Sequence, residues 1–341
     1  MNPLTSESGR LRAAWRLLAQ YLSYRVVAAL LVNLGVVSWL LIRVGPKSLS
    51  SGGASVVSLT SYSSVFLISN LASVAAALLT VWMSGRLLDR RPFRDFGFRL
   101  DGGWWLDLSF GMVLGALLMT AIFLTQFALG WADVTGSFEA AGGSTGTSFA
   151  FAILPPLAAF VCVGVAEETV FRGYGLRNTA EGLSGVLGPR TSVLAAWALT
   201  SVFFGMLHVF NPNATVMSTI NIALAGILLG IGYVLTGELA IPIGLHIAWN
   251  FFQGSVFGFP VSGLEPVGST FLSVRQGGPT LFTGGAFGPE GGLLVTAAIL
   301  AGSLLISAWV RLRHGRVDIH SQLAEAPEKH APSTTESQTV R

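Results

Sequence analysis

Hydrophobic residues in this chain form long stretches without formal charge, separated by short polar or arginine-rich segments. A helix needs about 20 apolar residues to cross the hydrocarbon core of a bilayer. The stretch 191–237 is long enough for two such helices, with a break at Asn211-Pro212-Asn213. The pattern predicts an all-α fold, a polytopic membrane helix bundle of about eight transmembrane helices. The apolar stretches are 26–42, 57–85, 108–132, 140–166, 191–237, 239–258 and 293–310.

The segments beside these stretches complete the predicted organisation. Residues 1–25 are basic, which is consistent either with an amphipathic helix on the inner leaflet or with a solvated flank that sets topology. Residues 259–290 are rich in glycine and proline, which predicts a long outer loop, and the polar tail 312–341 is predicted to be disordered. The other parts are the N-terminal spans at 26–135, a central core at 140–258 and the last span at 291–311.

Arginine clusters lie beside the apolar stretches and orient them. With eight spans, all three clusters and both chain ends fall on one side of the membrane, which the positive-inside bias identifies as the cytoplasm. We therefore predict a multi-pass protein of the cell membrane with cytoplasmic N- and C-termini. The clusters are Arg10, Arg12, Arg16 and Arg25 before the first span, Arg86, Arg90, Arg91, Arg94 and Arg99 between the second and third, and Arg311, Arg313 and Arg316 after the last.

The composition supports a bilayer environment and excludes several classes of protein. Hydrophobic residues make up 52% of the chain and charged residues 11%, whereas soluble domains carry about 25% charged residues. This balance excludes a soluble enzyme, a disordered regulator and a coiled coil. The net charge of +3 comes mainly from arginines beside the spans, so nucleic acid is not an expected partner. The single cysteine, Cys162, excludes an intrachain disulfide.

A few ionisable side chains interrupt the apolar pattern in the second half of the chain. Each costs about 2.5–3.5 kcal/mol to insert, so such groups usually face a cavity or a partner. Glu168 and Arg172 are four residues apart on a helix, which favours an ion pair, whereas Glu167 lies about 100° away around the helix and stays available. An interfacial patch at the end of the span is equally consistent with these residues.

Two histidine motifs follow on later stretches. His246 and Asn250 are four residues apart, so both emerge on one helix face, where their N–H groups suit stabilisation of a negative oxygen or hydrogen bonds between helices. His208 follows Phe204 by four residues and precedes the expected break at Asn211. Single membrane histidines are more often satisfied core residues, but irregular backbone at this depth must be buried or line a cavity. Together with the glutamates, these motifs predict a shared polar site.

In this order, the motifs Glu167-Glu168-x-x-x-Arg172, Phe204-x-x-x-His208 and His246-x-x-x-Asn250 resemble those of the CPBP family, the bacterial and archaeal branch of the CAAX prenyl endopeptidases, also called Abi proteins. The resemblance covers about residues 150–255. It implies an intramembrane endopeptidase with a site open to the cytoplasmic side and with 140–258 as its catalytic core. The implied substrate is a hydrophobic or membrane-tethered peptide or protein.

The resemblance also implies a role for each motif residue. Glu167 is the general base that activates water, and His208 positions that water. His246 and Asn250 form the pair that stabilises the oxyanion. Peptide hydrolysis needs such a base, a proton donor for the leaving amine and donors to the oxyanion. The implied supporting residues are Glu168, Arg172 and Phe204.

A metal ion is the main alternative for activating water. The family has often been described as metalloproteases, and Glu167, His208 and His246 are of the ligand types found in catalytic zinc sites. The chain lacks a His-Glu-x-x-His motif, and ligation would remove His246 from the oxyanion pair. We therefore favour metal-free catalysis and expect no cofactor, with a divalent metal such as zinc as the alternative.

The sequence is also consistent with other functions, and it poses one geometric problem. A non-catalytic scaffold or a bacteriocin-immunity-type peptide-binding protein is one alternative, and a transporter is another, although the chain shows no internal repeat. If the fifth span begins at Arg190, His208 lies about 27 Å along it, whereas His246 lies only about 10 Å from the cytoplasmic side. A shared site therefore predicts a steeply tilted or late-starting fifth span and a fourth span that extends past Arg172.

Overall fold

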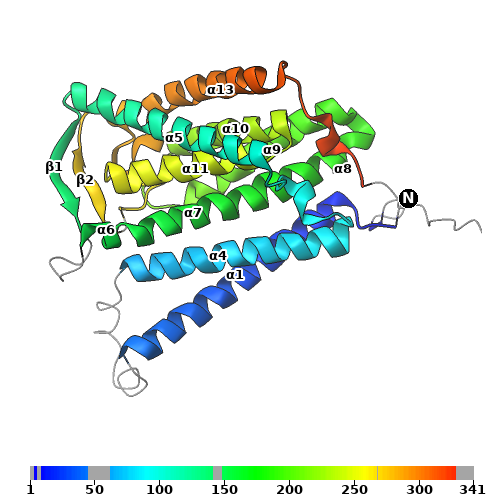
Figure 1. Ribbon diagram of the computed structural model, residues 1–341, viewed down its shortest axis with the longest axis horizontal. Coiled ribbons are helices and arrows are strands. Elements are labelled where there is room, and N and C mark those ends of the chain that lie inside the picture. The colour runs from blue at the N-terminus through cyan, green and yellow to red at the C-terminus, as the bar shows by residue number, and fades with distance from the viewer. Residues whose placement is uncertain (1–3, 6–8, 45–61, 141–147, 267, 328–341) are drawn as a thin grey trace, which may run out of the picture.

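The computed structural model describes residues 4–5, 9–44, 62–140, 148–266 and 268–327. Among these residues, seven helices are long and apolar enough to cross a membrane. An eighth helix, α11 (Ala240–Phe251), is continued by the π-helical turn η5 (Phe252–Val256). The chain is thus a multi-pass membrane protein with the predicted helical bundle (Figure 1). The seven long helices cover Ala13–Ile42, Ser64–Asp89, Gly102–Ala128, Phe149–Leu187, Pro189–Phe210, Val216–Thr236 and Leu293–His314.

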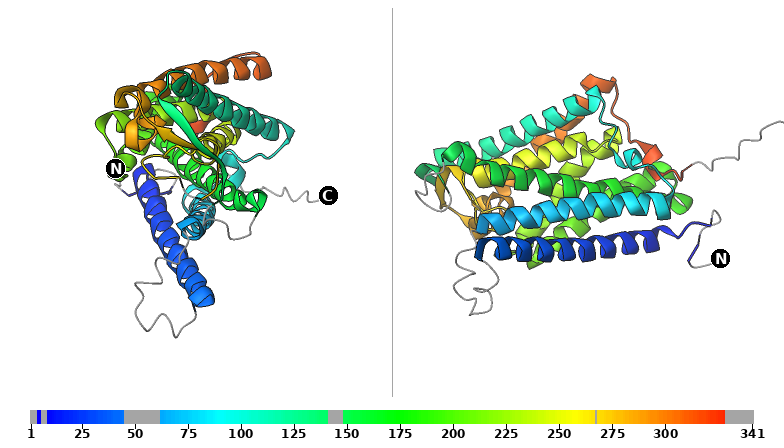
Figure 2. Two further views of the ribbon diagram at one scale, coloured as in Figure 1. Left: turned by 90° about the vertical axis from the view of Figure 1, so that its left-hand side faces the viewer. Right: turned by 60° about the horizontal axis from the view of Figure 1, so that its bottom comes forward.

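The short helix α11 is the central element of the bundle. It packs against α5 (Gly102–Ala128), α10 (Val216–Thr236) and the fourth span, and α13 (Leu293–His314) contacts both α5 and α10. Every residue of α11 from Ala240 to Asn250 is buried. Because protein encloses α11 on all sides, this helix needs no wide lipid-facing surface and can be short. At one side of the bundle, α1 (Ala13–Val44) pairs with α4 (Tyr62–Ser84) (Figure 2).

Glycines allow α5 and α11 to approach closely. A Cβ at Gly111 would overlap the carbonyl oxygen of Ile241, and a Cβ at Gly244 would overlap that of Leu108. Small residues at such contacts let two helix backbones come together in a membrane, where van der Waals packing drives association. The contact fixes the position of α11, which carries His246 and Asn250.

The fourth and fifth spans form an antiparallel hairpin. The fourth begins with α6 (Phe149–Ala152) and α7 (Leu154–Glu168) and continues through the π-helical η3 (Thr169–Leu176) into α8 (Arg177–Leu187), so it extends past Arg172 as predicted. The fifth span, α9 (Pro189–Leu207), follows Gly188 directly. The expectation of a late start is therefore wrong.

The length of this hairpin explains how Glu167 and His208 reach the same depth. Glu167 lies 21 residues before Gly188, and His208 lies 20 residues after it. At about 1.5 Å per residue, both are roughly 30 Å from the turn. Because α8 packs along α9, the two arms bring Glu167 and His208 to a similar depth.

The segment 259–290 is more structured than the predicted outer loop. It contains β2 (Thr270–Gln276), the short helix α12 (Thr280–Thr283) and the 3-10 turns η6 (Gly285–Phe287) and η7 (Pro289–Gly291). β2 pairs antiparallel with β1 (Ala132–Glu139), in a register from Ala132↔Gln276 to Glu139↔Thr270. Phe259 and Phe287 are buried and attach the segment to the bundle. The glycine and proline content of the segment did not indicate that these two phenylalanines are buried.

The N-terminal region does not form a separate element that ends at residue 25. Helix α1 begins at Ala13 and runs without interruption into the first span. Arg10 and Arg16 are buried rather than solvated, because Glu181 of α8 accepts hydrogen bonds from both. The predicted boundary at residue 25 is therefore wrong, and the alternative of a solvated flank does not fit Arg10 and Arg16.

The prediction of a disordered tail at 312–341 is wrong for its first part. Helix α13 continues to His314, and the 3-10 turn η8 (Ser321–Ala324) packs against α8 and α9. The side chain of Leu323 is completely buried there. Residues 328–341 lie outside the described residues. The described ends of the chain lie at the same end of the bundle, opposite the β-strands (Figure 1).

Candidate active site

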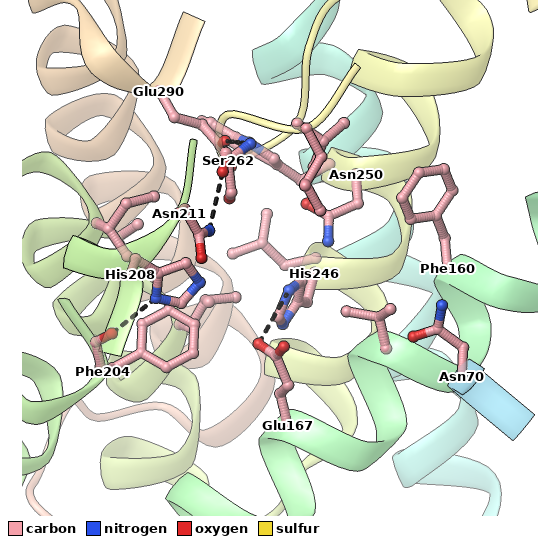
Figure 3. A pocket seen from close by; sticks show the side chains of 18 of the residues that line it. Asn70, Phe160, Glu167, Phe204, His208, Asn211, His246, Asn250, Ser262 and Glu290 are labelled. Atoms are coloured by element: carbon pink, nitrogen blue, oxygen red, sulfur yellow. Dashed lines mark hydrogen bonds and ion pairs between the residues drawn. The ribbon is translucent and has the colours of Figure 1, made fainter. Parts of the chain in front are cut away.

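All four predicted catalytic residues line one cavity of ≈ 310 Å³. Glu167 comes from α7, His208 from the end of α9, and His246 and Asn250 from α11. Figure 3 shows these side chains directed toward the same space from different helices. Much of the remaining wall is apolar, and residues of the segment 259–290 line the other side. The cavity is therefore a polar site enclosed by hydrophobic helices.

Glu168 lies behind the cavity wall and carries the ion pair expected from its spacing. Its Oε1 accepts a hydrogen bond from Arg172 Nη1 at 2.9 Å and one from His246 Nδ1 at 2.7 Å. The Glu168 side chain is fully buried and that of Arg172 almost so. The Arg172 guanidinium lies 4.5 Å from the centre of the Phe204 ring, within cation–π distance. This buried group therefore connects three helices and orients His246.

Glu167 is the carboxylate that stays available. Its side chain is 31% exposed, in contrast to the fully buried Glu168. Its Oε2 lies 3.9 Å from His246 Nε2, the ring nitrogen not bonded to Glu168. Adjacent glutamates thus have different environments, because the one-residue step turns one toward Arg172 and the other toward the cavity.

His208 occupies the point where α9 ends. The helix passes into the 3-10 turn η4 (His208–Phe210), and the break at Asn211 and Pro212 follows as predicted. The Nδ1 atom of His208 lies 2.8 Å from the carbonyl oxygen of Phe204. A carbonyl oxygen only accepts hydrogen bonds, so Nδ1 carries the proton and Nε2 of the neutral ring is an acceptor. The ring is thereby held in one tautomer.

Two of the motif-bearing helices change to π geometry within the motif or just after it. The segment η3 begins at Thr169, immediately after Glu168, and η5 begins at Phe252, two residues after Asn250. Single π turns inside α-helices often occur at functional sites. Here both π-helical segments lie beside the cavity. The ion pair between Glu168 and Arg172 is kept across the start of η3.

The structure adds polar residues that the sequence analysis missed. Glu290 lines the cavity and accepts hydrogen bonds from the backbone N–H and the hydroxyl of Ser262. Asn211 donates to the carbonyl oxygen of Ser262 at 2.9 Å. Burial raises the pKa of Glu290, although the hydrogen bonds from Ser262 oppose this shift. Glu290 lies just before the last span in a glycine-rich segment, so its sequence resembles an ordinary loop.

Two further polar side chains reach the cavity from segments without a motif. Asn70 comes from α4, and its side-chain nitrogen donates to the carbonyl oxygen of Phe66 at 2.8 Å. Glu265 belongs to the segment 261–266. Neither residue is marked by spacing to another polar group in the sequence, so only the fold brings them to the site.

The positions of the donor atoms decide whether the metal alternative fits this site. Among the described residues, no three His, Cys, Asp or Glu side chains are grouped so that they could hold a metal ion. Nδ1 of His246 is bonded to Glu168, and its Nε2 faces Glu167. Glu167, His208 and His246 in this arrangement therefore do not fit a zinc site, and no step below depends on a metal.

Comparison with known proteins agrees with the position of this site. Residues 148–252 match the family described as type II CAAX prenyl endopeptidase Rce1-like. The matched segment contains every motif residue from Glu167 to Asn250, so the resemblance noted in the sequence is confirmed. The family is described as one of endopeptidases.

A more distant similarity extends beyond the family segment. The chain is 27% identical over 214 residues to the uncharacterized protein YyaK of Bacillus subtilis (strain 168). The alignment covers 58% of this chain and 67% of the relative. No solved structure matches the chain. Glu290 and β2 lie outside the segment 148–252 that the family describes.

Proposed function

We propose that the protein is an intramembrane endopeptidase that hydrolyses peptide bonds of hydrophobic or membrane-tethered substrates. The observation that carries the proposal is the pairing of two unequal glutamates around His246. Glu168 is bonded to Nδ1 of the imidazole, while Glu167 lies in the cavity near Nε2. This arrangement leaves the carboxylate of Glu167 and the Nε2 N–H donor of His246 on the same side of a largely apolar cavity.

Glu167 acts as the general base in this proposal. Its carboxylate takes a proton from a water molecule, the water oxygen attacks the peptide carbonyl carbon, and the same proton is later given to the leaving amine nitrogen. His208 holds the water through Nε2, which is the acceptor nitrogen of the ring because Nδ1 donates to Phe204. Return of the proton to the amine restores the carboxylate for the next reaction cycle.

His246 and Asn250 stabilise the oxyanion formed by the attack. When His246 is doubly protonated, Nδ1 donates to Glu168 and Nε2 donates toward the carbonyl oxygen of the substrate. Asn250 is one helical turn further along α11 and lines the same cavity, so its side-chain NH2 supplies the second donor. Donors held in fixed positions are effective because they need little reorganisation as charge develops. Glu168 and Arg172 hold the imidazole, and Phe204 packs against both His208 and Arg172.

The proposed location is the cell membrane with both chain ends in the cytoplasm. The arginine clusters beside the spans lie at the end of the bundle that holds the described ends of the chain (Figure 1). The positive-inside bias places this end in the cytoplasm. Substrates are expected to reach the cavity as lipid-associated or hydrophobic peptides, because most of its wall is apolar.

Cleavage of a peptide library by the detergent-solubilised protein tests the proposal. We expect Glu167→Gln to lower the rate about 10²–10⁴-fold, the usual contribution of a general base. The exposed Glu139 provides the matched control, and Glu139→Gln should cleave like the wild type. A metal chelator should leave the wild-type rate unchanged. Retained cleavage by Glu167→Gln would overturn the assigned base, and loss of activity with a chelator that zinc restores would overturn the metal-free mechanism.

A further inference from the structure

A second cavity, of ≈ 590 Å³, lies at the end of the bundle that carries the N-terminus (Figure 1). It is formed by the connection between α4 and α5, the first residue of α8, the turn between α10 and α11, and residues 320–327. None of its lining residues lines the active-site cavity. We call it the arginine cavity, because its lining includes Arg90, Arg91, Arg94, Arg99 and Arg177.

The carboxylates near the arginine cavity do not balance these charges. Among the described residues, five arginines line it, against three carboxylates, those of Asp95, Glu238 and Glu325. Glu238 is already paired with Arg99 at 2.8 Å. Behind the wall, Glu181 is shared by Arg91 and two arginines of the N-terminal region. The cavity therefore carries an excess of positive charge.

Two of the arginines have no carboxylate partner among the residues that the structure describes. Among the described residues, neither Arg90 nor Arg177 has a carboxylate oxygen within 4.0 Å. Arg177 donates instead to the carbonyl oxygen of Asp95 at 2.6 Å, which is a neutral acceptor. Arg94 is 77% exposed and lies 3.9 Å from Asp95, at the limit for an ion pair. Arg90 and Arg94 are thus exposed guanidinium groups, and the charge of Arg177 is not neutralised by a carboxylate in contact with it.

The excess of positive charge also affects the pKa values of neighbouring titratable groups. The pKa of Arg91 is lowered by burial and then by the charge of Arg177, although Glu181 opposes the shift. The pKa of His320, which lines the cavity, is lowered by burial and then by the charges of Arg177 and Arg99. A bound anion would relieve this repulsion.

We propose that the arginine cavity binds a phosphate group of an anionic ligand through Arg90, Arg94 and Arg177. The planar guanidinium group donates two parallel hydrogen bonds to phosphate oxygens, a geometry that suits arginine better than lysine. The cavity lies at the end of the bundle flanked by arginine clusters, where basic pockets between helices meet the headgroups of the cytoplasmic leaflet. An anionic phospholipid and a soluble phosphate both supply this chemistry.

Binding to the purified protein distinguishes these sources. The probes are short-chain phosphatidylglycerol, short-chain phosphatidylcholine and inorganic phosphate, each titrated while bound lipid is counted by native mass spectrometry and unfolding temperature is recorded. The variant is Arg90→Gln/Arg94→Gln, which removes two exposed charges. The matched control is Arg86→Gln/Arg311→Gln, which removes two exposed charges at the same end without touching the cavity.

We expect phosphatidylglycerol to bind the wild type and the control equally and the Arg90→Gln/Arg94→Gln variant at least about tenfold more weakly, because charge-assisted hydrogen bonds are lost. Competition by inorganic phosphate would support a general phosphate site, and its absence would support a lipid headgroup site. Equal phosphatidylglycerol binding by variant and control, or equal binding of phosphatidylcholine and phosphatidylglycerol by the wild type, would overturn the proposal. The readout is independent of peptide cleavage, so it is unaffected if the proposed peptidase reaction fails.

Discussion

At the scale of single residues, the adjacent glutamates of the first motif have separable roles. Glu168 is fully buried and is the only carboxylate within 4.0 Å of Arg172 among the described residues. Glu168→Gln therefore leaves a buried guanidinium uncompensated, which typically costs about 3–5 kcal/mol. Glu167→Gln removes a partly exposed charge whose partner, His246 Nε2, lies 3.9 Å away, at the limit for an ion pair. We expect the first substitution to lower the unfolding temperature strongly and the second to leave it nearly unchanged.

Thermal unfolding of both variants in the same detergent measures this difference. Glu168→Asp serves as a further control, since it keeps the charge and alters only the reach of the side chain. A larger loss of stability in Glu167→Gln than in Glu168→Gln would contradict the assignment of Arg172 to Glu168. The order of the two effects is informative even where cleavage cannot be measured.

The motif residues were predictable because their spacing and their rarity in apolar stretches are visible in the sequence. A four-residue step places Glu168 beside Arg172 and His246 beside Asn250 on any helix. Glu290 was not predictable, because its approach to the cavity depends on the fold of the segment 259–290. Local spacing reveals pairs on one helix, whereas contacts between distant segments require the tertiary structure.

At the scale of elements, helix positions followed from apolar length, but irregular geometry did not. The π-helical segments η3 and η5 lie in apolar sequence that reads as ordinary helix. The strand β2 is seven residues long and lies in a glycine-rich region that provides no clear alternation of hydrophobic and polar positions. These elements are fixed by packing against the bundle, and that information is absent from a local window of sequence.

The segment 315–327 illustrates an element whose attachment depends on pH. His320 packs against Gly237, its backbone N–H donates to the Val234 carbonyl oxygen, and Leu323 is buried nearby. Burial and the charges of Arg177 and Arg99 lower the pKa of His320 in the attached state. The detached segment has an imidazole pKa of about 6.5. Attachment is therefore strongest above about pH 6.5, and it weakens by at most about 1.4 kcal/mol per pH unit as the pH falls below that value.

Hydrogen–deuterium exchange of residues 318–324 at pH 7.5 and 5.5, corrected for intrinsic exchange, measures the attachment. Protection should decrease at the lower pH in the wild type. In His320→Gln the pH dependence should disappear, because glutamine does not titrate. Unchanged protection in the wild type at both pH values, or a persistent pH dependence in the variant, would contradict this role of His320.

At the scale of the whole molecule, a buried ion-pair network attaches the N-terminal helix to the bundle. Glu181 of α8 accepts hydrogen bonds from Arg10, Arg16 and Arg91 at 2.6–2.9 Å, and Arg16 also pairs with the fully buried Asp89. The sequence left open whether these arginines lie on an amphipathic helix at the inner leaflet or on a solvated flank. The positive-inside pattern predicts the side of the membrane on which arginines lie, but it does not reveal which carboxylate from a distant helix will meet them.

We expect Glu181→Gln to detach α1 from the bundle and to lower the free energy of unfolding by about 3–5 kcal/mol, because it removes the carboxylate that three buried arginines share. Adding Arg10→Gln should restore part of this loss, since the double variant buries one fewer arginine beside the missing carboxylate. Asp133→Asn is the control: Asp133 pairs with Arg275 on the surface, where an ion pair contributes about 1 kcal/mol or less. Denaturant unfolding in one detergent compares these variants. A Glu181→Gln protein as stable as Asp133→Asn would mean that apolar packing between α1 and α4 alone holds the N-terminal helix in place.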